Sequence, residues 1–308
     1  MSVLQLAGYL STALFAIVVA AKMVKIAKMP IHIRWDLYPI PHERGKGSYG
    51  GSYFEEVDWW TKPNNFSLVS ELKAMAMEII FVQSVFHHNR KLWIFSFPFH
   101  FGLYCLCGLL GLLTVGAIMG AAGLPVTADS PNAFAVIVYH ATTVLGVAGF
   151  VLATLGAIGL FFSRMTGELG KASVISDYVN LLILLAVTVS SLYSWATIDP
   201  DFAIVRSFVQ SLFTFSPAPV LPAAVATQLW IWVALMFYFP FTHMTHMFGK
   251  YFTYHKVRWE DHPNIRGSEI EKRVQEALGY NITWSAPHIK SGGTWAEAAT
   301  APEEDSEK

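Results

Sequence analysis

The chain has 308 residues, of which 54% are hydrophobic and 14% are charged, and its formal net charge at pH 7 is -1. This composition is too apolar for an ordinary soluble domain and predicts a polytopic membrane protein. The near-zero charge gives no sign of nucleic-acid binding. The two cysteines, Cys105 and Cys107, lack the number and spacing that an iron–sulfur cluster, a structural zinc or a covalently attached haem requires.

Five segments are apolar over about 20 residues or more, the length needed to cross a hydrocarbon core roughly 30 Å thick. They cover residues 3–23, 92–122, 133–162, 174–198 and 223–248. The first lacks the features of a cleaved secretory signal, and we interpret it as a retained helix. The sequence therefore predicts an all-α membrane protein, with five transmembrane helices in a bundle over residues 1–250 and a tail over residues 251–308.

The distribution of basic residues predicts the orientation of this bundle. Among 21 lysines and arginines, only Arg206 lies in a segment that would face outward. The positive-inside rule therefore predicts that the N-terminus is outside and that the C-terminal tail is cytoplasmic.

Residues 24–91 form a cytoplasmic or interfacial segment in this topology. Its first part is rich in proline, glycine and aromatic residues and predicts an irregular loop, whereas residues 65–86 predict an interfacial helix. In the tail, residues 268–278 predict a short helix, and the acidic residues 301–308 predict disorder.

Four of the eleven histidines lie within the predicted transmembrane helices: His100 in the second, His140 in the third, and His243 and His246 in the fifth. An unsatisfied polar group at lipid depth costs several kcal/mol, so an intramembrane histidine indicates a functional site. At 1.5 Å per residue, His100 lies about 14 Å past Lys91 and His246 about 6 Å before Lys250. Both are thus expected in the cytoplasmic half of the bilayer.

Two imidazoles at one level on two helices predict a haem held between them, with iron bound by His100 and by one histidine of the fifth helix. The alternative is a pair of core histidines that bond to the backbone or to each other. His243 and His246 are three residues apart and share a face of the predicted helix, so spacing alone does not choose between them.

Two stretches carry a family resemblance. FPFTHMTH, residues 239–246, resembles the end of the fifth helix in the membrane gamma subunit of respiratory nitrate reductase. WIFSFPFHFGLYCLCGLLG, residues 93–111, resembles the second helix of that family, which carries a haem-ligating histidine near its inner end. The long inner segment and the tail look closer to the Dsr-type and Tmc-type cytochrome b subunits of menaquinol-linked complexes in sulfur and sulfate metabolism.

The resemblance implies that the inner haem b is held by His100 and His246, with His243 in the surrounding shell or on the propionate side. The ligands of the family's outer haem would fall at Leu110 and Gln228, which are not imidazoles. One haem b is therefore expected, and a second is left open.

His140 falls at or beside the outer-side lysine that the family associates with its quinol site. The resemblance implies that His140 hydrogen-bonds a quinone oxygen and accepts its proton near neutral pH. The alternatives are that His140 ligates a second haem, or that it is a polar packing residue.

The function expected from these features is that of an oxidoreductase subunit acting only within a complex in the prokaryotic inner membrane. Menaquinol is oxidised near the outer face, and electrons reach a cytoplasmic iron–sulfur subunit through haem b; the reverse direction is equally allowed. Other membrane or periplasmic cytochrome subunits are further expected partners. The rival interpretations are a transporter or channel that uses the same histidines as a proton path, and a membrane anchor without a cofactor.

Overall fold

The computed structural model describes residues 1–29, 40–43, 52–63, 65–255, 259, 264–286 and 289–301. No β-strand occurs among these residues, and their regular structure is helical. The chain divides into two compact units, Met1–Val19 with Lys73–Thr245, and Ala20–Leu72 with His246–Lys308. Each unit is described by itself below.

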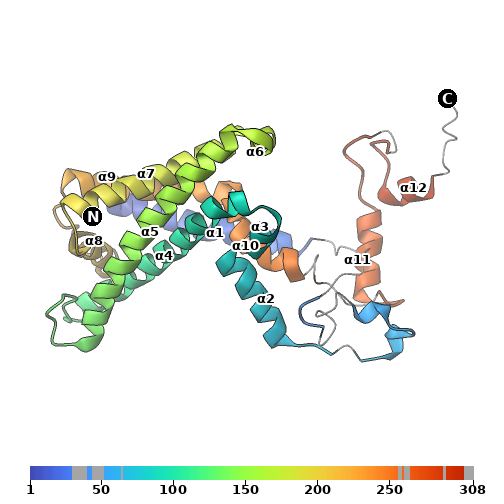
Figure 1. The fold of residues 1–308 in the computed structure, drawn as a ribbon, viewed down its shortest axis with the longest axis horizontal. Helices are drawn as coiled ribbons and strands as arrows, with labels where there is room; N and C mark the ends of the chain where they lie inside the picture. Colours follow the sequence, from blue (N-terminus) through green and yellow to red (C-terminus); the bar gives the residue numbers. More distant parts are fainter. Residues whose placement is uncertain are drawn as a thin grey trace. The chain divides into compact units, whose positions relative to one another are not determined.

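Five helices of the described chain are long and apolar enough to cross a membrane, as predicted. They are α1 (Val3–Ala27), α4 (Arg90–Ala121), α5 (Ala133–Met165), α7 (Ile175–Thr197) and the segment Ala223–Phe241, which contains α9 (Ala223–Tyr238) (Figure 1). In the first unit α5 packs between α4 and α7, and α9 packs on α7. The prediction of five spans is confirmed, and the ends of the first four lie within four residues of those expected.

Helices α4 and α5 meet backbone against backbone. A Cβ atom on Gly156 would lie 2.5 Å from the backbone nitrogen of Phe99, and one on Gly102 would lie 2.9 Å from the carbonyl oxygen of Gly149. Only hydrogen fits at these two positions. Small residues at such contacts are typical of helices that associate in lipid, where close packing replaces the hydrophobic driving force.

The predicted fifth helix is shorter than expected. It was predicted to reach residue 248, but α9 ends at Tyr238, the turn η3 (Phe239–Phe241) follows, and Thr242 is extended with φ -100° and ψ 172°. Pro240 has no N–H to continue the helical hydrogen bonds. The hydroxyl of Thr242 then accepts from the backbone N–H of Met244 at 3.1 Å, which favours a turn.

The chain resumes with the short turn η4 (His243–Thr245) and the separate helix α10 (His246–Thr253). The expectation that His243 and His246 share one face of a continuous transmembrane helix is therefore wrong. His243 lies in a turn, and His246 is the first residue of a new helix.

The interfacial helix predicted over residues 65–86 is present but interrupted. Helix α2 (Leu68–Phe81) ends at Val82, whose φ of 50° is left-handed, and α3 (Gln83–His88) follows. The hydroxyl of Tyr104 on α4 donates to the carbonyl oxygen of Ile79 at 2.6 Å, which ties the end of α2 to a membrane-spanning helix.

The segments that the sequence predicts to be cytoplasmic lie only partly within the described residues. Most of the predicted irregular loop and residues 302–308 lie outside the described residues, and residues 52–63 contain the single turns η1 (Tyr53–Glu55) and η2 (Trp59–Thr61). In the tail, α11 (Glu269–Leu278) confirms the predicted helix, with Ser268 as its N-cap, and α12 (Trp295–Thr300) follows.

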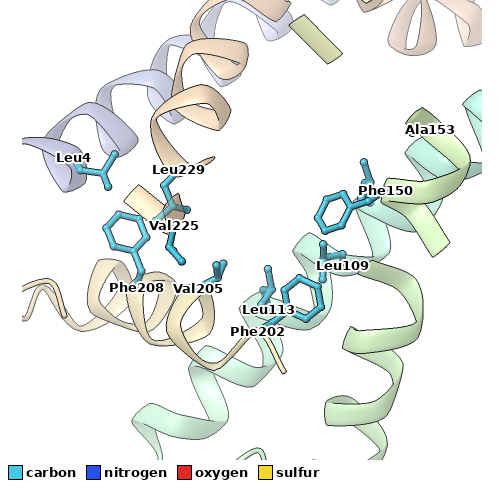
Figure 2. Packing of buried hydrophobic residues seen from close by; sticks show 11 residues of the cluster. Leu4, Leu109, Leu113, Phe150, Ala153, Phe202, Val205, Phe208, Val225 and Leu229 are labelled. Carbon is cyan, nitrogen blue, oxygen red and sulfur yellow. The ribbon is translucent and has the colours of Figure 1, made fainter. Parts of the chain in front are cut away.

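Helix α8 (Ala203–Thr214) was not predicted. It follows Phe202, which packs with Val205 and Phe208 into a cluster of buried residues from α1, α4, α5 and α9 (Figure 2). Arg206 on the same helix is 7% exposed and donates to the carbonyl oxygens of Val126 and Asp201, each at 3.1 Å. Burial lowers the pKa of the Arg206 guanidinium, and the nearby Asp201 and Asp199 partly offset that effect.

The α4–α5 contact gives the first prediction. Gly102→Ala places a methyl group against the backbone of α5, and such overpacking costs about 1–3 kcal/mol or more of stability. We expect a clear fall in the thermal unfolding temperature of the detergent-solubilised protein.

The control is Gly111→Ala, the same change on the same helix, where a Cβ would meet nothing within 4 Å. Alanine is favoured over glycine in a helix, so this variant should be neutral or slightly more stable. An equal loss of stability in both variants would contradict the close-packing explanation.

Candidate functional site

His100 on α4 has a defined tautomer. Its Nδ1 lies 2.7 Å from the carbonyl oxygen of Ser96, one turn earlier, and 3.3 Å from the Ser96 hydroxyl. A carbonyl oxygen only accepts hydrogen bonds, so Nδ1 carries the hydrogen and Nε2 carries the lone pair. Metal-binding histidines typically have this arrangement, in which one ring nitrogen donates to a carbonyl and the other is the ligand.

The α4–α5 contact also fixes the position of His100. The neighbouring residues Phe99 and Gly102 are both buried, and they pack against Gly156 and Ala153 of α5. The backbone on either side of the imidazole therefore has little freedom to move. A ligand that must hold a fixed geometry benefits from this kind of rigid support.

Both ring nitrogens of His243 lie close to polar side chains of α7. Nδ1 lies 3.4 Å from the side-chain nitrogen of Asn180, and Nε2 lies 3.4 Å from a carboxylate oxygen of Asp177. The other oxygen of Asp177 accepts from Arg164 at 3.2 Å. Asn180, Asp177 and Arg164 thus form a polar cluster with His243, although the His243 side chain is 56% exposed.

Sequence reasoning missed this cluster. The available signal was Asp177, an acidic residue just inside the span predicted over residues 174–198. Asp177 also accepts from the backbone N–H of Val174 at 3.1 Å, so it caps the first turn of α7 as well as binding Arg164. The amide oxygen of the buried Asn180 has no hydrogen-bond partner among the described residues.

His140 lies far from His100 along the helix pair. His100 is level with the stretch of α5 around Ala153, which is 13 residues beyond His140 in sequence. That separation corresponds to about 20 Å along the helix axis at 1.5 Å per residue. The side chain of His140 is exposed on α5, whereas Val138 and Thr142 point into the packed interior.

His246 is exposed at the start of α10 and belongs to the second unit, whereas His100 and His243 belong to the first. The pairing of His246 with His100 therefore stays a prediction.

The two positions expected for ligands of an outer haem have different environments. Leu110 is 45% exposed on α4, while Gln228 on α9 is 4% exposed. The buried positions beside them are Leu109, Leu113 and Leu229, which belong to the apolar cluster closed by α8 (Figure 2). This part of the bundle interior is filled by hydrocarbon side chains.

Two apolar grooves lie on the first unit. One has a volume of about 480 Å³ and runs between α7 and α9, beside Ile183, Trp230 and Tyr238. The other has a volume of about 560 Å³ and lies along α4 and α5, beside Phe95 and Ser163. Both have the size of small-molecule sites, and none of the four candidate histidines lines either groove.

Among the described residues, no group of three or more His, Cys, Asp or Glu side chains could hold a metal ion. Axial ligation of haem iron requires only one or two side chains. The finding therefore concerns a metal ion held entirely by protein side chains and does not bear on haem.

A family model described as the nitrate reductase gamma subunit matches residues 74–260, and this range contains His100, His140, His243 and His246. No curated protein and no solved structure matches the chain. The family consists of membrane subunits that bind haem b and transfer electrons within multi-subunit respiratory complexes. The match covers more than half of the chain and agrees with its five apolar helices, so this is a multi-pass membrane protein that belongs to the nitrate reductase gamma subunit family.

Proposed function

We propose that this chain binds one haem b through His100 and His246 and transfers electrons between menaquinol and an iron–sulfur subunit on the cytoplasmic side. The observation that carries the proposal is the hydrogen bond from His100 Nδ1 to the Ser96 carbonyl oxygen, which leaves the lone pair on Nε2. Haem b supplies one-electron redox chemistry when bound. The chain supplies the ligands, their orientation and the exclusion of water.

The choice of His246 over His243 is supported by the partners of His243. Asn180 and Asp177 engage both of its ring nitrogens, which suits a hydrogen-bonding role better than a ligand role. The family resemblance also puts the ligand at the second of the two histidines. We assign His243 to the propionate side of the haem, where an imidazole N–H is a suitable donor.

The proposal of a single haem is supported by the residues at the other end of the bundle. Leu110 has no ligand atom and points away from the core, and Gln228 is not an imidazole. The apolar cluster around Leu109 and Leu229 packs the space between α4 and α9 at that level.

The proposed topology follows from the basic residues, with the N-terminus outside and the tail over residues 251–308 in the cytoplasm of a prokaryotic cell. The five-helix domain over residues 1–250 is then the cytochrome, and the inner segment and tail face the partner subunits. The resemblance of the inner segment and the tail supports a role like that of the Dsr-type and Tmc-type cytochrome b subunits.

His140 is proposed to accept a proton from menaquinol. Its exposed position on α5 suits a lipid-soluble substrate that arrives from the bilayer, and an imidazole is a common general base. Oxidation of the quinol to the quinone releases protons on the outer side in this topology. Reduction of menaquinone by the reverse route uses the same groups.

The haem ligands can be tested by substitution. We expect His100→Ala and His246→Ala each to abolish the b-type absorption bands, while His243→Ala retains them. The measurement is haem per polypeptide by the pyridine haemochrome method, with an expected value of about one in the parent protein.

His87→Ala is the control, because His87 is exposed outside the membrane-spanning helices. Full haem in the His246 variant together with loss of haem in the His243 variant would reverse the assignment. A parent protein without any b-type bands would favour the transporter or the cofactor-free anchor.

The role of His140 gives a separate prediction. General acid–base catalysis by a positioned side chain contributes about 10²–10⁴-fold to rate, so His140→Ala should slow quinol-dependent haem reduction by about 100-fold. Chemical reduction by dithionite and the haem content should not change.

His140→Gln is the matched variant, because glutamine can hydrogen-bond a quinone but cannot accept its proton at neutral pH. Loss of half of the haem in either variant would instead make His140 a ligand of a second haem. Unchanged quinol-dependent rates would make it a packing residue.

A further inference from the structure

A second group of histidine and carboxylate side chains lies in the other unit, outside the candidate haem site. Glu71 on α2 is 5% exposed, although it carries a carboxylate. His255 Nε2 lies 2.6 Å from one of its oxygens, and His42 Nδ1 lies 3.1 Å from the other. One buried carboxylate therefore lies between two imidazoles from distant parts of the sequence.

Two hydrogen bonds hold the ring of His255. Its Nδ1 lies 2.8 Å from the carbonyl oxygen of Tyr251, which can only accept. Its Nε2 faces the Glu71 carboxylate at a distance that requires a proton between the two atoms. Both ring nitrogens of His255 are therefore held, Nδ1 by the Tyr251 carbonyl oxygen and Nε2 by the Glu71 carboxylate.

Aromatic rings surround His255. Its ring stacks on that of Tyr251 with centroids 4.1 Å apart, and the edge contact with Trp259 is at 5.6 Å. Trp259 itself is 5% exposed and donates its backbone N–H to Tyr254, so the aromatic surroundings are fixed.

The other charged and titratable groups near the pair are Glu43, Tyr53, Lys250 and Tyr254. Glu43 is 3% exposed, and its carboxylate accepts from the backbone N–H of Tyr53 at 2.7 Å. Lys250 lies over the ring of Tyr254 at 5.4 Å. Two buried carboxylates, Glu43 and Glu71, thus adjoin His42.

These contacts join three stretches of the chain. The backbone N–H of Ser67, just before α2, donates to the His42 carbonyl oxygen at 2.8 Å, so His42 is fixed relative to Glu71. His255 lies two residues beyond α10. Within α10, Gly249 is buried, and its Cβ position would lie 3.6 Å from Ile26 at the end of α1. Helix α10 is therefore held at Gly249 by packing and at its C-terminal end by the Glu71 pair.

We infer that Glu71 and His255, with His42 beside the second carboxylate oxygen, form a clamp that fixes α10 and thereby sets the position of His246, its first residue. The clamp itself stands on the contacts above, and its effect on a haem ligand rests on the proposed function. Glu71 and His255 are positioning residues in this inference.

The test is hydrogen–deuterium exchange of the peptide that contains residues 246–255, in the full-length protein. Glu71→Gln and His255→Gln should each raise its exchange at neutral pH by at least about tenfold, because each removes the imidazole–carboxylate pair that holds the end of α10. Glu71→Asp, which keeps the charge, should restore much of the protection.

His88→Gln is the matched control. His88 Nδ1 lies 2.8 Å from the carbonyl oxygen of Ser84, the same local bond that His255 makes, but His88 is exposed. In this variant, the exchange of the peptide that contains residues 246–255 should equal that in the parent protein. Equal exchange in the parent, Glu71→Gln and His255→Gln proteins would overturn the clamp.

The second readout is the midpoint potential of the haem. In Glu71→Gln this potential should shift relative to the parent protein, whereas in His88→Gln it should not. An unchanged potential in Glu71→Gln would overturn the link to His246. Exchange that responds as expected in a protein without haem would support the clamp and contradict the proposed function.

Discussion

The contact of α4 with α5, backbone against backbone, is the constraint on which the rest of the membrane unit depends. Lipid chains are as apolar as leucine, so these helices gain little from excluding their surroundings and associate through close packing instead. Glycine at 102 and 156 allows that approach, and Phe99 then inserts against α5. Because His100 lies between Phe99 and Gly102, the same packing that joins the helices also fixes the candidate ligand.

The second constraint is that an unpaired polar group within the bundle is costly, so buried polar side chains there mostly form hydrogen bonds. Gln5 on α1 is 1% exposed and donates to the hydroxyl of Ser211 and the carbonyl oxygen of Ser216. Arg206 binds the loop that joins α4 to α5 through Val126. Both side chains connect α8 to the long helices, and the apolar side of α8 then closes that end of the bundle.

The number and approximate ends of the membrane-spanning helices could be predicted because length and apolar composition determine them directly. The end of α9 could not, because the apolar pattern continues past residue 241. Proline alone is no reliable sign of an ending in a membrane protein, since Pro98 lies inside the continuous helix α4. What ends α9 is Pro240 together with the hydrogen bond at Thr242, and that bond depends on three-dimensional geometry.

Part of the candidate site could also be predicted from the sequence. His100 could be predicted as a candidate because an imidazole within an apolar membrane helix is costly unless it has a partner. Its hydrogen bond to the Ser96 carbonyl oxygen provides a partner for Nδ1. Asp177 and Glu71 did not stand out, because a carboxylate near a helix end is usually solvated. Their importance comes from His243 and His255, which are distant in sequence and become neighbours only in the folded chain.

The interruption after α9 changes how the two adjacent histidines are supported. In a continuous helix, one rigid body would carry both His243 and His246, and any movement would affect them equally. With the extended residue Thr242 between α9 and η4, His243 is held by Asp177 and Asn180 of α7. His246 instead begins α10, whose supports are Gly249 and the buried pair of Glu71 with His255. The position of His246 therefore depends on Ile26 and Glu71, which are distant from it in sequence, and not on the α7 residues that hold His243.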